Sequence, residues 1–550
     1  MLAFLAFLAL TLSWSLGVPL LSAADEPEHV VRAAAAVRGE FSGQNEIRYF
    51  TGSKPVLGPP DFLEVVYHLP HSLVVALQAH DPGCYAFNYD INPNCVTESN
   101  AAQVKAAGDT DTSHMNYSPL YYLATGWPSL FLRGDAAIYG MRVVSAIITA
   151  LMMAGAFTTS IRRRGAAAVG VLAAATPTAI YFGSVVNPSG PEISSALLAW
   201  AAFLSLVRAE PGAPGIRRDR ALFAVSAAVL IMVRPLGPVW LAGIAVATLI
   251  AVADGGVRER VTRVLRSPGV RWSGGLLGVA LLAAGFWDVT RNTTGIVPEA
   301  DPDFTYAKSI YLTIFQTPAF LSQMLGSLGW IGRVPMLTTM LWYGAISGLV
   351  LLALVLGNRR ERFALLLLAV SIVVFPILFE AYSGREYGVG WQGRYTLPLA
   401  VGLPILAAEI AARRLTALTP AAVLRSLATV FGATIALAYL CEVWWMWRRY
   451  AQNMVSGHVL PIPAKWSPPI GWPAMLFLAL LGCVTLFVIL RHSALAPAAG
   501  LDAGDGPAGA GAADPAADGS GTGTGTEPDV LAMPDALAVS ALEAAPTAAS

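Results

Sequence analysis

The stretch LSAADEPEHVVRAAAA, residues 21–36, decides how the chain is organised, because it marks where a first apolar segment meets water. Residues 2–22 carry no charge, whereas three carboxylates and a histidine lie between Asp25 and His29. About 20 apolar residues are enough for a helix to cross a bilayer. We therefore expect a first transmembrane helix in segment 1–22, followed by an acidic cluster at the rim of the membrane.

This start leaves two alternatives open. The segment also resembles a secretory signal peptide, since LSAA before Asp25 is a small-residue cleavage pattern, although no Lys or Arg precedes the apolar run. Asp25 is in addition a candidate N-cap of a helix that begins with Glu26 and Pro27, with Glu28 completing a capping box. A carboxylate at a boundary between water and lipid can instead act as a general base on a hydroxyl group.

The composition identifies the class of protein. Apolar residues make up 55% of the 550 residues, 13% are charged and the mean hydropathy is +0.58, which is typical of a membrane protein. The net charge of +0 argues against nucleic acid as a partner. Only Lys54, Lys105, Lys308 and Lys465 among the 35 basic residues are lysines, and Ala, Gly and Pro are abundant. This usage is a weak indication of a GC-rich bacterial source.

About twelve apolar runs are candidates to span the membrane. They cover 2–22, 136–158, 165–184, 192–207, 221–234, 236–253, 273–290, 336–356, 363–380, 396–412, 426–446 and 471–490. Arginines cluster at every second connection, which the positive-inside rule assigns to the cytoplasm. The other connections, including the one that opens with Asp25, face outward. The sequence thus predicts an all-α polytopic protein of the bacterial inner (plasma) membrane.

Two outward loops are large enough to hold structure. In the first, apolar residues recur at helical spacing over 62–77, which predicts an amphipathic helix on the outer membrane surface, kinked at Pro70. The apolar stretch 119–132 is too short to span and holds two prolines, so we expect it to be re-entrant or interfacial. In the second loop, 291–335, the segment YAKSIYLTIFQTPAFLSQML is amphipathic as well and is expected on the bilayer.

Four regions follow from this map. They are a first transmembrane helix at 1–22, an extracytoplasmic loop with interfacial helices at 23–135, a multi-helix transmembrane domain at 136–491 and a tail at 492–550. Beyond Arg491 the tail has eight acidic residues, no basic one and many Ala, Gly, Pro and Thr. Such a composition predicts a disordered cytoplasmic tail without a catalytic role.

The cysteines agree with the predicted sidedness. Cys84 and Cys95 lie in one outward loop, GCYAFNYDINPNC, where an oxidising environment permits a disulfide. Asp109 and Asp111 in GDTDTSH offer carboxylates to a divalent cation, but one short acidic run is a poor metal signature. No cofactor is certain from the sequence, no metal ligand set is assigned, and a divalent cation stays an open alternative.

Five motifs occur in order at matching places in the predicted topology. They are DEPEH at 25–29, NYSPLYYL at 116–123, NPSGPEI at 187–193, GSLGWIG at 326–332 and GWQGRYTLPL at 390–399. Together they resemble the predicted bacterial membrane protein family catalogued as domain of unknown function 2142, over roughly residues 10–490. That family is similar to the GT-C glycosyltransferases, integral membrane enzymes that use sugars linked to lipid phosphates.

The resemblance implies a function and roles for residues. GT-C enzymes place an acidic residue in the first outward loop, close to the end of the first helix, and Asp25 stands there with Glu26 as a substitute. Either carboxylate would deprotonate an acceptor hydroxyl, which attacks a polyprenyl-phosphate-linked sugar with inversion. Arg394 would hold the lipid phosphate, since Arg suits bidentate phosphate binding. Its alternative role is an interfacial anchor that snorkels to the headgroups.

Further candidates for substrate binding are less specific. Asn187 stands in a tight outward turn and is equally a cap of the following helix. Tyr117 is a candidate for the sugar site or for an aromatic belt, and His29 is more often a structural hydrogen-bonding residue than a catalytic one. Gln392 belongs to the same motif as Arg394 and completes this set.

Three hypotheses about function therefore remain. The first is a membrane glycosyltransferase that moves a sugar from a polyprenyl-phosphate donor to a cell-envelope glycan, lipid or protein on the outer face. The second is a transporter or flippase of lipid-linked glycans, for which Arg142 is the clearest buried charge, although no internal repeat is evident. The third is a non-catalytic envelope-assembly protein in which Asp25 only caps a helix.

Overall fold

The computed structural model describes most of the chain. The described residues are 1–41, 44–49, 61–88, 90–96, 109–112, 117–209, 214–252, 257–266, 269–291, 305–326, 328–330, 334–387, 389–453 and 463–494. Residues Met1–Ala503 form one compact unit. The predicted disordered tail lies almost entirely outside the described residues.

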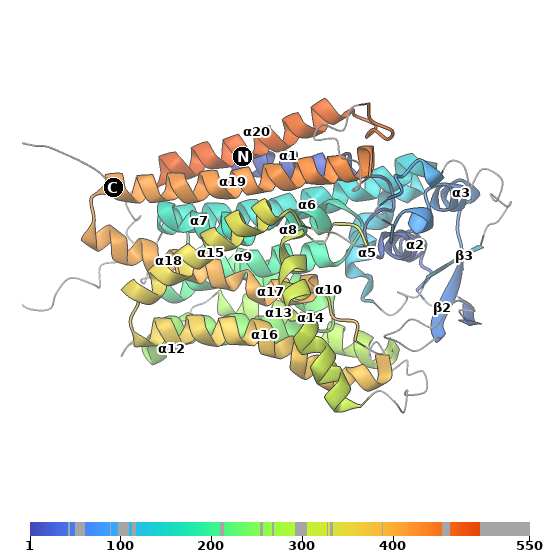
Figure 1. The fold of residues 1–550 in the computed structure, drawn as a ribbon. Coiled ribbons are helices and arrows are strands. Elements are labelled where there is room, and N and C mark those ends of the chain that lie inside the picture. Colours follow the sequence, from blue (N-terminus) through green and yellow to red (C-terminus); the bar gives the residue numbers. More distant parts are fainter. Residues whose placement is uncertain are drawn as a thin grey trace, which may run out of the picture. The chain divides into compact units, whose positions relative to one another are not determined.

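Every predicted membrane span coincides with a helix or a pair of helices (Figure 1). In chain order these are α1 Leu2–Ser15, α6 Gly134–Arg163, α7 Ala168–Ala174 with α8 Pro177–Ser184, α9 Ser189–Arg208, α10 Ile216–Val233, α11 Gly237–Val252, α13 Val270–Arg291, α15 Met336–Leu356, α16 Arg359–Tyr387, α17 Gly393–Ala400 with α18 Gly402–Leu418, α19 Ala421–Ala451 and α20 Trp472–Ser493. The α-helical polytopic class is therefore confirmed.

The number of full-length spans is smaller than twelve. Within the described residues, eight helices are long and apolar enough to cross a membrane, or nine if the pair α7 and α8, bent by 67°, is one span. Helices α1 and α11 are apolar but shorter, with 14 and 16 residues. Helix α10 begins with the charged segment IRRDR, which leaves too short an apolar run. Such short and broken helices need protein neighbours that cover their ends.

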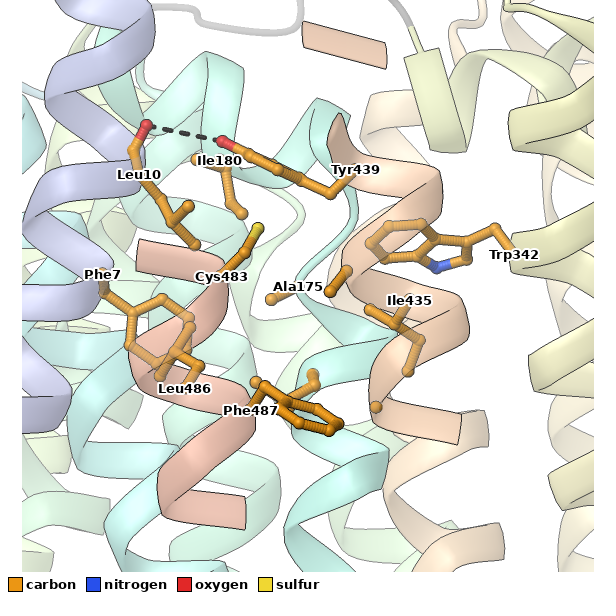
Figure 2. A pocket seen from close by; sticks show the side chains of 13 residues that line it. Phe7, Leu10, Ala175, Ile180, Trp342, Ile435, Tyr439, Cys483, Leu486 and Phe487 are labelled. Atoms are coloured by element: carbon orange, nitrogen blue, oxygen red, sulfur yellow. Dashed lines mark hydrogen bonds between the residues drawn. The ribbon is translucent and has the colours of Figure 1, made fainter. Parts of the chain in front are cut away.

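Helix α1 is part of the core of the bundle. It packs against α6 and α20, and its Trp14 Nε1 donates a hydrogen bond of 2.6 Å to the Tyr439 hydroxyl. Nearby, Figure 2 shows a small cavity whose lining includes Leu10, Tyr439 and Cys483. Its volume of about 30 Å³ and its apolar lining make it a packing defect rather than a ligand site. Removal of residues 1–22 as a signal peptide would take these core side chains away.

The segment between α1 and α6, predicted as the first extracytoplasmic loop, contains a sheet that the sequence did not predict. After α2 (Glu26–Ala36), the strands β1 (Gln44–Tyr49), β2 (Asp61–His68) and β3 (Asp109–Thr112) form an antiparallel sheet in the order β1-β2-β3. The predicted amphipathic helix over 62–77 is therefore wrong in its first half. Only its second half is helical, as α3 (His71–Ala79), and Pro70 is the N-cap that separates the two elements.

The other two segments that were expected at the membrane surface are helical. The stretch expected to be interfacial forms α5 (Pro119–Gly126) and the 3₁₀ turn η2 (Trp127–Leu130), with a run of exposed apolar side chains. They are Leu120, Leu123, Trp127, Leu130, Phe131 and Leu132. The second amphipathic segment forms α14 (Tyr306–Gly326) with Pro318 inside it. Helix α12 (Val257–Arg266) and the 3₁₀ turns η1 (Pro82–Cys84) and η3 (Gly165–Ala167) complete the described helical elements.

A disulfide joins Cys84 and Cys95, the pair expected from the sequence. The loop that it closes docks on the end of α19. Arg449 donates three hydrogen bonds to main-chain carbonyls of this loop, to Tyr85 at 2.9 Å, Asn88 at 2.8 Å and Ile91 at 2.7 Å. One arginine thus donates to three main-chain carbonyl groups of a segment that is neither helix nor strand.

Candidate active site around Asp25 and Arg394

Asp25 immediately precedes α2 and has an unusual backbone. Its φ of 63° lies in the left-handed region, which Asp and Asn tolerate better than other residues with a side chain. Its side chain makes no capping hydrogen bond to α2. Asp25 thus occupies the predicted N-cap position, but the side-chain capping bond that this role would supply is absent.

The carboxylate of Asp25 instead forms an ion pair with Arg394. Arg394 lies in the first turn of α17, and its side chain is fully buried, whereas that of Asp25 is 19% exposed. The bonding Nη2 also donates to the Tyr395 hydroxyl at 3.2 Å. The other two nitrogens, Nε and Nη1, have no hydrogen-bond partner within the described residues. A buried guanidinium with unused donors is suited to an anion.

The burial of Arg394 also rules out one predicted role. An interfacial anchor snorkels and keeps its charged group among the lipid headgroups. Here the guanidinium lies inside the protein, 4.7 Å from the ring centre of Phe182 and 5.1 Å from that of Tyr395. Such contacts add cation–π attraction and fix the plane of the guanidinium.

A second arginine, Arg234, completes the cationic part of the site. It follows α10, and its guanidinium lies 5.0 Å from the ring centre of Tyr395 and 5.3 Å from that of Tyr117. Arg234 and Arg394 therefore contact the same tyrosine ring. Glu192 is 3.7 Å from Arg234 Nε, an ion pair without a hydrogen bond, and it accepts a bond of 3.1 Å from Trp240.

Glu26, although adjacent to Asp25 in sequence, lies in a different environment. It forms a bidentate pair with Arg142 at 2.5 and 2.6 Å, and both side chains are completely buried. The remaining donors of Arg142 go to the carbonyls of Ser15, Val18 and Pro19 at 2.8–3.2 Å. This pair therefore ties α2 to α6 and to the chain that follows α1.

Asn187 and Gln392 support the two ends of the ion pair. Asn187 donates to the carbonyl of Ala24 at 3.0 Å and accepts from the Ser189 amide at 2.9 Å, so it holds the residue before Asp25. Gln392 is the N-cap of α17, and its carbonyl accepts from the Tyr395 amide at 2.9 Å. Its side chain is half-buried and makes no capping bond.

Aromatic rings and His29 form the wall of the site on the side of α2. His29 Nδ1 and the Tyr122 hydroxyl are hydrogen-bonded at 3.0 Å, and the rings of His29 and Tyr117 are 5.9 Å apart. Burial raises the pKa of the Tyr117 phenol, although the nearby Arg234 partly opposes the shift. Burial also raises the pKa of Tyr122 well above its usual value. Both phenols are therefore neutral at physiological pH.

The arrangement offers an acid–base group next to two cations. Asp25, Arg394 and Arg234 come from three distant parts of the chain, yet the side chain of Tyr395 connects both arginines. Guanidinium groups stabilise charge that develops on a phosphate, and a carboxylate accepts a proton from a hydroxyl. Within the described residues no group of three or more His, Cys, Asp or Glu side chains is placed to hold a metal ion.

Three residues of the site were not assigned from the sequence. Arg234 stood only as the last residue of the predicted span 221–234, and Glu192 and Tyr395 only as parts of motifs. A signal was present for Arg234. It stands at the outer end of a predicted span, where the positive-inside rule makes an arginine unusual.

Comparisons with known proteins give one family and two distant structures. No curated protein matches the chain. Among solved structures, ArnT from Cupriavidus metallidurans in the apo state matches at 14% identity with a TM-score of 0.35, over 78% of this chain and 73% of that one. ArnT from the same organism bound to undecaprenyl phosphate matches at 13% identity with a TM-score of 0.38, over 89% and 76%. The profile of the family described as predicted membrane protein (DUF2142) matches residues 8–403, and the chain therefore belongs to this family.

Proposed function

We propose that this protein is a membrane glycosyltransferase that moves a sugar from a polyprenyl-phosphate donor to a hydroxyl of a cell-envelope acceptor on the outer face of the membrane. One observation carries the proposal. A partly exposed carboxylate, Asp25, is paired with the buried Arg394, whose Nε and Nη1 have no hydrogen-bond partner within the described residues. A base and a phosphate ligand are the two groups that such a transfer needs within one site.

In the proposed reaction Asp25 acts as the general base. The acceptor hydroxyl attacks the anomeric carbon of the sugar and loses its proton to the Asp25 carboxylate. The bond between the anomeric carbon and the phosphate oxygen breaks, and the electron pair leaves with the polyprenyl phosphate. Attack from the face opposite to the phosphate gives inversion. Arg394 and Arg234 stabilise the negative charge on the departing phosphate.

The surroundings of α17 suit the lipid part of the donor. An apolar cavity of about 180 Å³ is lined by side chains from α7, α14, α15, α16, α17 and α18. One of them is Leu397, which lies one helical turn beyond Arg394. A donor whose phosphate rests on Arg394 would place the first part of its apolar chain next to this cavity.

Glu26 is the weaker candidate for the base. Its two oxygens accept bonds from Arg142, and one of them also accepts from the Val186 amide at 3.2 Å. A carboxylate that is fully buried and engaged in this way has no route to an acceptor hydroxyl. We therefore assign Glu26 and Arg142 to the framework that positions Asp25.

The two competing functions have less support. The transporter hypothesis rested on Arg142 as a buried charge, but Arg142 is neutralised by Glu26 and has all of its donor nitrogens bonded. The assembly-protein hypothesis needed Asp25 as a helix cap, and its side chain makes no capping bond. Neither hypothesis accounts for two arginines around one tyrosine at the outer rim.

The test is a transfer assay with purified full-length protein in lipid vesicles. A panel of radiolabelled polyprenyl-phosphate sugars serves as donor and envelope extract as acceptor. Wild type is compared with Asp25→Asn and with Asp135→Asn as the matched control. Asp135 is also an acid at the outer side and is bonded to His80 at 3.0 Å, but it lies outside the site.

We expect label transfer by wild type and Asp135→Asn, and a loss of about 10²–10⁴-fold in Asp25→Asn. Equal rates in all three proteins would contradict the role of Asp25 as base. No transfer from any donor by wild type, with the protein shown to be folded, would contradict the transferase itself.

A further inference from the structure

A second arginine cluster lies at the opposite end of the helical bundle. Figure 1 shows α12 and α18 at the end away from α2, α3 and the sheet. The cluster is formed by side chains near the ends of α6, α9 and α18 and at the start of α16. Its members, named here the inner arginine cluster, are Arg163, Arg208, Arg413, Arg414, Glu361 and Glu409.

Two arginines of the cluster are hydrogen-bonded to its two carboxylates. Arg163 is bonded to Glu409, and Arg413 is bonded to Glu361. Glu361 also accepts from the Asn358 amide at 2.9 Å, while the Asn358 side chain accepts from the Glu361 amide at 2.9 Å. This reciprocal capping box fixes Glu361 at the start of α16.

Arg208 lies between the two carboxylates without a hydrogen bond to either. Its Nη2 is 3.5 Å from Glu361 Oε1, and its Nε is 3.9 Å from Glu409 Oε1. Both nitrogens have no hydrogen-bond partner in the part of the chain that the structure describes. The Arg208 side chain is only 14% exposed, so water reaches it poorly.

The charges of the cluster do not balance. Four guanidinium groups face two carboxylates, which leaves an excess of two positive charges among these six residues. Buried charge without compensation is costly, and arginine in particular favours oxygen atoms arranged as in phosphate. The structure therefore supplies both the charge and the unused N–H donors of an anion site.

The position of the cluster suggests where the anion comes from. Arg208 ends the candidate span Ser189–Arg208, and Arg163 ends the candidate span Gly134–Arg163. Side chains at the ends of spans lie at the depth of the lipid headgroups, and basic pockets between helices on the cytoplasmic side bind anionic lipids. The positive-inside rule places this end of the bundle in the cytoplasm.

We propose that the inner arginine cluster binds a phosphate oxyanion through Arg208, carried by an anionic lipid headgroup of the inner leaflet or by free phosphate. The site is separate from Asp25 and Arg394, because it lies at the other end of α9 and α18. It does not depend on the proposed transferase activity. Its occupancy would join α6, α9, α16 and α18 through one ligand.

The experiment measures thermal unfolding of the full-length protein in nanodiscs. One arm uses phosphatidylcholine alone, the second adds phosphatidylglycerol, and the third adds inorganic phosphate to phosphatidylcholine discs. Wild type is compared with Arg208→Gln and with Arg217→Gln, an exposed arginine of α10 that is the matched control. Arg414→Gln, at the more exposed edge of the cluster, is a second variant in case Arg208→Gln does not fold.

We expect phosphatidylglycerol to raise the unfolding midpoint of wild type and Arg217→Gln by several degrees, because a ligand that binds only the folded state stabilises it. Arg208→Gln should lose this shift, and Arg414→Gln should reduce it. An equal shift with inorganic phosphate supports the oxyanion site and identifies free phosphate as sufficient. The same shift in Arg208→Gln as in wild type, or no shift in either arm, would overturn the proposal.

Discussion

Two neighbouring residues, Asp25 and Glu26, each pair with a buried arginine, and the two pairs differ in every other respect. The pair of Glu26 and Arg142 is closed, since both side chains are completely buried and every donor nitrogen of Arg142 is bonded. The pair of Asp25 and Arg394 is open, since Asp25 is 19% exposed and Arg394 keeps unused nitrogens within the described residues. A closed pair fixes the backbone, whereas an open pair can meet a substrate.

The difference shows how two adjacent residues can serve two purposes, one to fix the backbone and one to meet a substrate. The left-handed backbone at Asp25, with φ of 63°, sends the two successive carboxylates toward different partners. Glu26 fastens the start of α2 to α6, and Asp25 is thereby held at a fixed place at the rim. We expect the stability of the protein to depend on the closed pair and its activity on the open pair.

The largest effect is expected from breaking the closed pair. Arg142→Met leaves Glu26 as a buried charge without its partner, which should lower the free energy of unfolding by about 3–5 kcal/mol. The measurement is the unfolding midpoint and the yield of folded protein in detergent. The double variant Glu26→Met with Arg142→Met is the control, because it removes both charges, and most of the stability should return. If Arg142→Met alone is as stable as wild type, the pair of Glu26 and Arg142 is not a closed, stabilising pair.

Breaking the open pair should affect activity instead. Arg394→Met is expected to lower transfer by about 10²–10³-fold, because a donor aimed at the developing charge is lost. The unfolding midpoint should change far less than in Arg142→Met, since the partner Asp25 keeps access to water. Parallel measurement of transfer and unfolding in the two variants decides the comparison. If Arg394→Met unfolds as easily as Arg142→Met, both pairs are structural.

Asn187 connects the two regions and should give an intermediate effect. Asn187→Ala removes two hydrogen bonds and leaves the buried carbonyl of Ala24 without its donor, at a cost of about 1–3 kcal/mol. Because Ala24 precedes Asp25, transfer should fall together with stability. Reduced stability with an unchanged transfer rate would show that Asn187 does not position Asp25.

The smallest effect separates the backbone of Asp25 from its charge. Alanine is strained in the left-handed region by about 1–2 kcal/mol, whereas asparagine tolerates it. Asp25→Ala should therefore be about 1 kcal/mol less stable than Asp25→Asn, while both lose transfer. Chemical denaturation of the two variants measures the difference. Equal stabilities would mean that the turn relaxes in the alanine variant.

The sequence predicted the membrane class and named both members of the open pair as site residues, whereas the alternation of inner and outer connections stays a prediction. Asp25 and Arg394 stand 369 positions apart, and only the resemblance of their motifs to one family indicated a shared site. The sequence did not predict that Asp25 and Glu26 differ in role, with Asp25 in the open pair and Glu26 in the closed pair. This difference depends on the backbone angle of Asp25 and on the positions of Arg142 and Arg394, which no local sequence pattern encodes.

Two further differences have local causes. The spacing of apolar residues over 62–77 fits a helix, but the same residues include β-branched and aromatic side chains that also suit a strand, and Pro70 separates the two elements. Arg234 was missed because an Arg-Pro step ends a helix in any context. Its approach to Tyr117 and Tyr395 depends on how α10 packs, which is a property of the whole bundle.

The docking of the disulfide loop on Arg449 also sets an order of events during synthesis. Ile91, whose carbonyl Arg449 holds, is made 358 positions earlier. At 5–20 residues per second, roughly 20–70 s separate the two on the ribosome. The two cysteines of the loop are therefore synthesised long before the arginine that receives the loop exists. The disulfide between Cys84 and Cys95 needs no distant partner, so it can hold this segment together until α19 has been synthesised.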